Sequence, residues 1–329
     1  MDLSIVIVSW NTRDILRNCL RSVFYQTQGI RSEVIVVDNA SSDGSAEMVK
    51  TEFSQVALIE NHDNRGFAVA NNQGMALSCG RYLLLLNSDT VVLDDAISKI
   101  VAFADNHPEA AVVGCRVLNP DKTLQPTCFM FPSLLNLVLA ATHLYKLFPR
   151  NKFFGRERMT WWDRSDTREV DVVTGCCMLV RREAIERVGI MDDAFFMYGE
   201  ETDWCYRLKF AGWKVMFTPG AQIIHFGKAS SSRIKSTMRL QLSGSILIYF
   251  KKHKGWIQYI FASFLTAIFF LIRIPYWLGI AIFSKKDRYP ALITVRTYSV
   301  GFFLSFAGYR YLCCKQTSSL HKDIKGAVW

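Results

Sequence analysis

The stretch YLLLLNSDT, from Tyr82 to Thr90, places five uncharged, mostly apolar residues directly before a polar triplet. Such a run is typical of a strand that is buried on both faces of a sheet. Asp89 then lies just beyond the carboxyl end of that strand, where open α/β sheets bind ligands. A carboxylate there can hold a divalent cation that bridges substrate phosphates, although Ser88 and Asp89 are also ordinary residues for the start of a helix.

The first half of the chain alternates between apolar runs and stretches with apolar residues on one helical face. The runs predict strands and the stretches predict helices. Their order predicts an α/β fold, a doubly wound and mostly parallel sheet with right-handed crossovers. The predicted strands are 3–8, 33–37, 56–60, 82–86 and 111–116, and the predicted helices are 12–25, 45–53, 66–79 and 94–106.

Residues 117–168 lose this rhythm. Four prolines and several aromatic residues predict a long excursion over the surface, of the kind that forms lids or acceptor sites. Regular structure is expected to resume over 170–181, with a helix over 182–188, a further regular stretch over 192–213 and a last strand over 215–217.

The charge of the chain is unevenly distributed. Residues 1–227 hold 23 Lys and Arg against 27 Asp and Glu, whereas residues 228–329 hold 16 against 2. The basic third is also the most apolar, and this combination favours an anionic membrane surface over nucleic acid as a partner. A hydrophobic content of 50% excludes a disordered protein.

Within the basic third, residues 256–272 carry no charge, and the apolar character continues to Phe283 after an interruption at Arg273 and Pro275. Lysines flank this run on both sides, whereas a simple spanning helix carries its positive charge mainly on the cytoplasmic side. We therefore expect a re-entrant or interfacial helix pair with both ends on the cytoplasmic face. A single spanning helix and a buried soluble pair are the alternatives.

The nine cysteines show no spacing typical of a metal site. No CxxC occurs, which argues against zinc and thioredoxin chemistry. An odd number of cysteines behind an N-terminus without a basic signal region predicts reduced thiols in the cytoplasm.

Polar clusters follow four of the predicted strands. Because the carboxyl ends of parallel strands share one edge, these clusters are expected to form one binding site. Trp10 can stack on a base or fill the core, Asp38 can accept from a base or ribose, and Arg65 can contact phosphate or stay solvated. The clusters are Ser9-Trp10-Asn11, Asp38-Asn39, Asn64-Arg65-Gly66 and Asn87-Ser88-Asp89.

Three carboxylates lie within four residues, at Glu200, Glu201 and Asp203. Their mutual repulsion destabilises a short segment, which suggests that one of them pairs with a cation or acts as a base. The alternative is a solvated helix N-terminus, which favours acidic residues. The aromatic residues at 195–198 argue against a solvated position.

His225 is the candidate partner of Asp89. It follows the apolar pair Ile223-Ile224, and a lone histidine in such a place is usually structural. Together with two diphosphate oxygens, however, one carboxylate and one imidazole would complete a site suited to Mn²⁺ or Mg²⁺.

Seven ordered motifs over about residues 3–230 resemble the family 2 glycosyltransferases with the GT-A fold. The resemblance is greatest to the rhamnosyltransferase-like branch of bacterial O-antigen and cell-wall polysaccharide synthesis. The motifs are VSWN, VVDNASSDGS, NRGFAVANN, LLLLNSDT, VTGCCMLVRREAI, FFMYGEETDWCYRLKFAGW and IIHFGKASS.

The resemblance implies an inverting transfer from a nucleotide-diphosphate sugar to a saccharide acceptor, such as one carried on polyprenyl diphosphate. By position, Trp10 and Asp38 would face the base. Asn87-Ser88-Asp89 stands for the DXD-type motif, in which Asp89 binds the metal, and His225 matches a later metal ligand.

The same resemblance places the catalytic base at Glu201. The family's motif is more often Glu-Asp-x-Asp, and here it is Glu-Glu-Thr-Asp, so the choice among Glu200, Glu201 and Asp203 stays open. The expected organisation is a GT-A catalytic domain over 1–230, with a nucleotide-sugar part over 1–116 and an acceptor part over 117–230. A basic, apolar, helical region over 231–329 would hold it at the cytoplasmic face of a bacterial membrane.

Two other functions are considered. A nucleotidyltransferase on a similar fold is disfavoured because no glycine-rich, basic phosphate loop follows the first predicted strand. A non-catalytic scaffold in a membrane polysaccharide complex is disfavoured because Asp89, Glu201 and His225 are all retained.

Overall fold

The computed structural model describes residues 1–227 and 235–307, which form two compact units. The first unit contains residues 1–131, 155–193 and 200–227, and the second contains residues 132–154, 194–199 and 235–307. The expected domain boundary at residue 230 lies outside the described residues. The two units do not follow a single cut in the sequence, because two internal segments group with the C-terminal helices.

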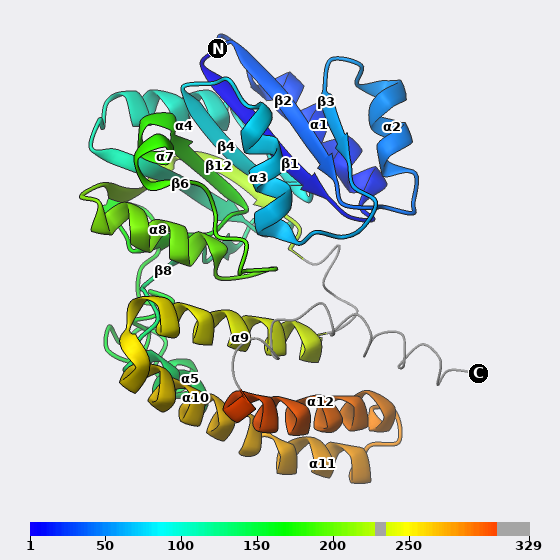
Figure 1. Cartoon of the computed structure of the whole chain (residues 1–329), viewed down its shortest axis with the longest axis vertical. Coiled ribbons are helices and arrows are strands. Elements are labelled where there is room, and N and C mark those ends of the chain that lie inside the picture. The colour runs from blue at the N-terminus through cyan, green and yellow to red at the C-terminus, as the bar shows by residue number, and fades with distance from the viewer. Residues whose placement is uncertain (228–234, 308–329) are drawn as a thin grey trace. The chain divides into compact units, whose positions relative to one another are not determined.

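The first unit is built on one ten-stranded sheet (Figure 1). Its strands are β1 (Leu3–Ser9), β2 (Ser32–Asp38), β3 (Ala57–Glu60), β4 (Tyr82–Asn87), β5 (Thr90–Val92), β6 (Ala110–Leu118), β7 (Leu124–Gln125), β9 (Arg168–Glu169), β11 (Cys177–Arg181) and β12 (Lys214–His225). The order is β3-β2-β1-β4-β11-β6-β12-β5, with β7 beside β6 and β9 beside β12. β3, β2, β1 and β4 are parallel, as are β6 and β12, whereas β11 is antiparallel to β4 and β6. The structure confirms the predicted mostly parallel α/β sheet.

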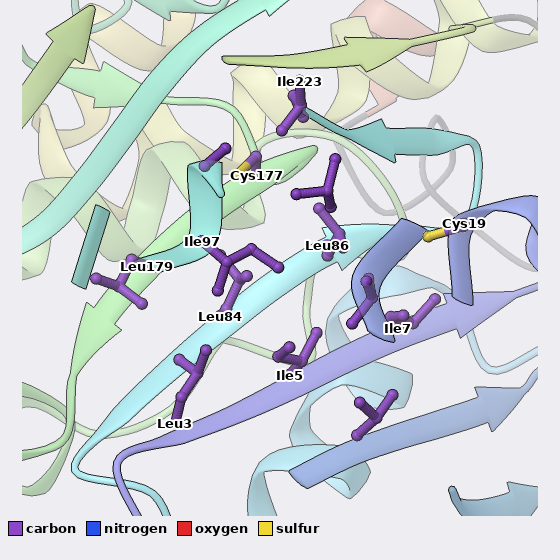
Figure 2. Packing of buried hydrophobic residues seen from close by; sticks show 14 of the residues in the cluster. Leu3, Ile5, Ile7, Cys19, Leu84, Leu86, Ile97, Cys177, Leu179 and Ile223 are labelled. Carbon is purple, nitrogen blue, oxygen red and sulfur yellow. The ribbon is translucent and has the colours of Figure 1, made fainter. Parts of the chain in front are cut away.

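Apolar side chains cover both faces of this sheet. From β1, Leu3, Ile5 and Ile7 enter one buried cluster and Val6 enters another. Figure 2 shows the first cluster, where the β1 side chains lie beside Leu84 of β4. Burial on both faces explains why the strands read as unbroken apolar runs. The first cluster is covered by α1 (Arg13–Gln26), α2 (Ser45–Glu52) and α4 (Ala96–Asp105), and the second by α3 (Phe67–Leu77), α7 (Arg182–Val188) and α8 (Glu200–Phe210).

Two strands near the candidate site differ from the prediction. β12 continues beyond the predicted 215–217 as far as His225, with a register shift against β6 between Thr218 and Gln222. This irregularity accommodates Pro219 and Gly220, which are residue types that weaken or end strands. The sequence does not predict β5, which pairs antiparallel with β12 and places Thr90 opposite His225.

The region 117–168 contains regular structure that the sequence does not predict. β8 (Cys128–Phe129) pairs with β10 (Val172–Val173) in a small second sheet of the first unit. α5 (Leu134–Thr142) begins after Ser133, whose side chain accepts a hydrogen bond from the backbone of Asn136. The expected surface excursion is therefore wrong for α5, which belongs to the second unit together with α6 (Leu144–Leu147).

The second unit is helical. Besides α5 and α6 it contains α9 (Lys235–His253), α10 (Gly255–Leu271), α11 (Ile274–Phe283) and α12 (Arg288–Ala307). α10 lies against α5, α9 and α12. α10 and α11 meet at Arg273, where the sequence predicts the interruption of the apolar run.

Two helical stretches in the described part of the chain are long and apolar enough to cross a membrane, Gly255–Phe283 and Arg288–Ala307. Their most apolar windows are only 28% and 22% buried within the structure, so neither resembles the core helix of a soluble protein. The second of these stretches, α12, is not among the predicted apolar helices.

Candidate active site

Three parallel strands of the first unit end at one edge of the sheet. In the β1–β2 ladder Ser9 pairs with Asp38, and in the β1–β4 ladder Val8 pairs with Asn87. The structure therefore brings Ser9, Asp38 and Asn87 to the same edge, as the sequence predicts. Ligands of open α/β sheets bind at such an edge.

A chain of hydroxyl groups joins the end of β1 to the turn that follows β4. Ser9 Oγ lies 3.0 Å from Thr12 Oγ1, and Thr12 donates a hydrogen bond of 3.1 Å to Ser88 Oγ. All three side chains are buried. Ser9 and Ser88, both candidates for nucleotide-sugar binding, thus hold the turn that carries Asp89 against β1.

Two buried thiols lie near this turn. Cys19 Sγ contacts the carbonyl oxygen of Asn87 at 3.6 Å, and the backbone carbonyl of Cys176 accepts from the N–H of Asn87 at 3.1 Å. Burial raises the pKa of each thiol to about 12. Both stay protonated at neutral pH and are poor nucleophiles.

Asp38 is nearly buried, with 3% of its surface exposed. Its Oδ2 atom accepts a hydrogen bond of 2.9 Å from the backbone N–H of Ser41. Its Oδ1 atom is buried and has no hydrogen-bond partner among the residues that the structure describes. Because an unpaired buried acceptor costs about 1–3 kcal/mol, this oxygen is suited to accept an N–H or O–H from a ligand.

The two residues that follow β1 have different roles: Trp10 exposes its ring, and Asn11 holds a neighbouring loop. Trp10 is 39% exposed, so the alternative of a core tryptophan is wrong and its ring can stack on a ligand. The side-chain oxygen of Asn11 accepts from the backbone N–H of Ser42 at 2.8 Å. Asn11 therefore holds the loop that follows β2.

Asn64 and Arg65 lie in a turn that is organised by Asn39. The Asn39 amide donates to Asn64 Oδ1 at 2.9 Å, and its oxygen accepts from the backbone N–H of Arg65 at 3.0 Å. The Arg65 guanidinium is half exposed and lies 3.6 Å from Asp63. Surface pairs of this kind contribute little stability, so Arg65 can exchange this partner for a phosphate.

Asp89 and His225 converge from the β4 turn and the end of β12. Asp89 Oδ1 lies 3.1 Å from His225 Nε2, and the two side chains are only 14% and 15% exposed. Asp89 Oδ2 accepts from the backbone N–H of Gly227 at 3.0 Å. Asn87 Nδ2 lies 3.2 Å from the same nitrogen of His225. The two chain segments therefore hold the carboxylate and the imidazole in one place.

Gln125 of β7 determines which nitrogen of His225 carries hydrogen. Its amide nitrogen donates to Asn119 Oδ1 at 2.9 Å and to the carbonyl of His225 at 3.2 Å, which turns its amide oxygen toward the ring. That oxygen can only accept, so His225 Nδ1, 2.6 Å away, is the donor. In the neutral ring, Nε2 then has a lone pair, which lies near both Asp89 Oδ1 and the Asn87 amide nitrogen. Sequence reasoning misses Gln125, which is 100 residues from His225 and belongs to no local motif.

This arrangement fits a divalent cation. A carboxylate oxygen and a nitrogen lone pair that face each other repel unless a cation or proton lies between them. Two ligands each about 2.1 Å from one ion, at a right angle, lie about 3.0 Å apart, close to the separation of Asp89 and His225. Among the described residues no three His, Cys, Asp or Glu side chains converge, so further ligands would come from substrate and water.

The acidic cluster lies at the start of α8. The expected regular stretch 192–213 is helical only over Glu200–Phe210. Glu200 and Asp203 are 3% and 1% exposed, so the alternative of a solvated helix terminus is wrong for both. Asp203 accepts from Arg207 Nε at 2.7 Å, and Arg207 also donates to one backbone carbonyl at the end of α7 and to one in the loop that follows α7. Glu201 is the more accessible carboxylate of the three.

A family comparison decides the identity of this arrangement. The profile of glycosyl transferase family 2 matches residues 4–189, more than half of the chain. The chain belongs to glycosyl transferase family 2. The match covers Asp38 and Asp89 but ends before α8 and His225.

Relatives of this family 2 glycosyltransferase include rhamnosyltransferases. It is 28% identical to the N-acetylglucosaminyl-diphospho-decaprenol L-rhamnosyltransferase of Mycobacterium tuberculosis, over 77% of this chain and 86% of that protein. It is 25% identical to rhamnosyltransferase WbbL of Escherichia coli, over 71% of this chain and 90% of that protein. These similarities confirm the predicted rhamnosyltransferase-like resemblance.

The fold of this glycosyltransferase is found in a solved enzyme. The mannosyltransferase PcManGT from Pyrobaculum calidifontis, determined in complex with GDP-Man and Mn²⁺, superposes with a TM-score of 0.56. The alignment covers 95% of this chain and 86% of that one at 15% identity. At this identity the likeness shows the shared GT-A fold.

Proposed function

We propose that this family 2 glycosyltransferase transfers a rhamnose-like or other hexose, with inversion, from a nucleotide-diphosphate sugar to a saccharide carried on polyprenyl diphosphate. The observation that carries the proposal is the 3.1 Å approach of Asp89 and His225 at the sheet edge that also holds Asp38. A nucleotide-diphosphate sugar requires a divalent ion beside its diphosphate and a hydrogen-bond partner beside its nucleoside. This edge offers ligands for the ion and a buried acceptor for the nucleoside. The similarity to the N-acetylglucosaminyl-diphospho-decaprenol L-rhamnosyltransferase supports the class of acceptor.

The nucleotide part of the donor is assigned to three side chains. The buried Oδ1 atom of Asp38 accepts a hydrogen from the base or the ribose. The exposed ring of Trp10 stacks on the base, and Arg65 contacts a phosphate. Four candidates act through the turns that they hold, namely Ser9, Asn11, Asn64 and Ser88, and Asn87 acts through its contact with His225.

Asp89 and His225 hold the metal in this proposal. Mn²⁺ or Mg²⁺ bound there would offset the negative charge that builds on the departing diphosphate. Gln125 orients His225 for this role, and Gly227 orients Asp89 through its backbone N–H.

Glu201 is the proposed base. It removes the proton of the acceptor hydroxyl as that oxygen forms a bond to the anomeric carbon. The bond from that carbon to the diphosphate oxygen breaks on the opposite face, and its electron pair leaves with the nucleotide. Glu200 and Asp203 are buried, and Asp203 is engaged by Arg207, which favours Glu201 as the carboxylate that an acceptor can reach.

The second unit is the proposed membrane anchor. Its two apolar stretches are long enough to enter a bilayer, and most of their surface is uncovered. Lys251, Lys252 and Lys254 precede them, and Lys285 and Lys286 lie between them, which suits an anionic cytoplasmic leaflet.

A thermal-shift screen of the full chain in detergent tests the donor site. Nucleotide-diphosphate sugars with different bases are added with Mn²⁺, with Mg²⁺ or with EDTA. We expect a rise in melting temperature that requires both metal and one class of base, and that disappears in Asp89→Ala. Asp89→Ala should keep the melting temperature of the free protein and lose sugar transfer. Near-normal transfer by Asp89→Ala in the presence of metal would remove Asp89 from the metal site.

A further inference from the structure

A cationic cluster lies inside the apolar second unit. Arg273, between α10 and α11, donates to the carbonyl of Phe269 at 2.8 Å and to the carbonyls of Ala140 and Ala141 at 3.2 Å each. Its Nη2 atom also lies 2.8 Å from His143 Nε2. The residue that interrupts the apolar run therefore binds the carboxyl-terminal end of α5, where a positive charge is favourable.

A second guanidinium shares the same aromatic ring. The carbon at the centre of the Arg273 guanidinium lies 3.7 Å from the centre of the Phe269 ring, and that of Arg239, from α9, lies 5.7 Å from it. Arg239 is partly buried, and it has neither a hydrogen bond nor an ion pair with the described residues.

The charges of this cluster act on His143. Burial lowers the pKa of His143, and the positive charges of Arg273, Lys146 and Arg239 lower it further. His143 is thus neutral at pH 7, and its Nε2 accepts the hydrogen bond from Arg273. Two guanidinium cations thus lie over one aromatic ring, and the imidazole hydrogen-bonded to one of them carries no charge.

Nothing acidic in the described part of this unit balances them. Its only Asp or Glu is Asp287, which accepts a hydrogen bond from Ser284 in the turn between α11 and α12. Arg239 and Arg273 are both partly buried, and like charges gathered in this way without a counter-charge repel one another. A bound anion would remove that repulsion.

We propose that Arg239 and Arg273 form a binding site for a phosphate or diphosphate group at the end of a hydrocarbon chain. Guanidinium groups bind phosphate through two parallel hydrogen bonds, and basic pockets between apolar helices recognise lipid head groups. The exposed apolar side chains of α10, including Phe261 and Phe264, offer a surface for the hydrocarbon part. The assignment deepens the proposed function, on which it rests for the expectation of a lipid-linked acceptor.

The test uses the full chain in dodecyl maltoside, with EDTA present so that no divalent metal supports binding at the first unit. Farnesyl diphosphate is titrated against intrinsic tryptophan fluorescence. We expect Arg239→Gln to weaken binding about tenfold or more, because it removes charged hydrogen bonds to the phosphate. The matched control, Arg296→Gln, changes an exposed arginine of α12 in the same unit and should leave binding unchanged. Arg273→Gln should also weaken binding, but Arg239→Gln is the decisive variant because Arg239, unlike Arg273, makes no hydrogen bond to another described element.

Three further ligands identify the source of the phosphate. Dihexanoyl phosphatidic acid that binds as tightly as farnesyl diphosphate would assign the site to membrane phospholipid, and a preference for farnesyl diphosphate would assign it to the acceptor. Farnesol should not bind. Equal affinity of Arg239→Gln, Arg296→Gln and the unmodified chain would overturn the proposal, as would inorganic diphosphate binding as tightly as farnesyl diphosphate.

The outcome can be separated from that of the proposed function. Asp89→Ala should bind farnesyl diphosphate normally while failing to transfer sugar. If the unmodified chain binds farnesyl diphosphate through Arg239 but transfers no sugar under any donor condition, the proposed transfer fails and the lipid-phosphate site stands.

Discussion

The side-chain oxygen of Gln125 lies 2.6 Å from His225 Nδ1, and this contact leaves Nε2 of the same ring on the side of Asp89. A glutamine in a two-residue strand therefore orients a histidine at the end of the longest strand of the sheet. Partners of this kind fix the tautomer and the orientation of metal-binding histidines.

Replacing this oxygen should weaken metal binding. We expect Gln125→Leu to lower Mn²⁺ affinity about 10-fold to 100-fold, because the imidazole loses the acceptor that fixes Nδ1 as its donor. Gln125→Glu should lose less affinity than Gln125→Leu, since a carboxylate accepts the same hydrogen bond although it gives up the two that the amide nitrogen donates. Free Mn²⁺ is measured by its electron paramagnetic resonance signal in the presence of nucleotide sugar, with Gln28→Leu, at an exposed glutamine of the first unit, as the control. Equal affinities for the leucine and glutamate variants would show that Gln125 does not orient His225.

Glu201→Gln should remove the base while sparing the donor site. We expect turnover to fall by roughly two to four decades, the usual contribution of general base catalysis. Nucleotide-sugar binding, followed by thermal shift with metal, should survive because Glu201 is not among the donor-binding residues. An active Glu201→Gln, together with a folded but inactive Asp203→Asn, would move the base to Asp203.

Asp203→Asn should act on stability. Asp203 is 1% exposed and accepts from Arg207 at 2.7 Å, so the neutral amide leaves Arg207 without its counter-charge. We expect a loss of about 1–3 kcal/mol in unfolding free energy, because Arg207 is itself partly exposed and keeps two backbone acceptors. Denaturant unfolding measures this loss, and Asp192→Asn, outside the ion pair, serves as a control. An unchanged midpoint for Asp203→Asn would show that the pair contributes nothing to stability.

A cysteine placed in the turn between α11 and α12 tests on which side of the membrane this turn lies. If α10 and α11 re-enter the cytoplasmic face, Lys285→Cys should stay unlabelled by an impermeant thiol reagent in intact cells and become labelled after lysis. The unmodified chain, which already has an exposed thiol at Cys79, gives the background in both conditions. Labelling of Lys285→Cys in intact cells would place this turn outside and favour a spanning arrangement.

The long strands could be predicted because burial on both faces demands unbroken apolar runs. β1, β2 and β4 show this pattern clearly. β5 and β7 could not be predicted, because three and two residues show no period and become strands only by pairing with β12 and β6. α5 could not be predicted, because its apolar residues are covered by α10, which lies far along the chain.

The site could be predicted where it depends on strand ends. Asp38 and Asn87 follow from the rule that parallel strands end at a common edge, and Asp89 lies two residues after Asn87. Gln125 could not be found in this way, because its role comes from one long-range contact. The proposed roles of Asp203 and Glu201 could be told apart only from their burial in the structure, because both side chains carry the same charge.

The two halves of the candidate metal site are made at different times. Asn87 and His225 meet across 138 positions of the chain, and His225 is the last residue of the last strand. A chain that is still leaving the ribosome completes β1, β2 and β4 well before this histidine exists. In such an intermediate the imidazole that faces Asp89 is missing. In the proposed mechanism the metal site is therefore complete only after β12 has been made.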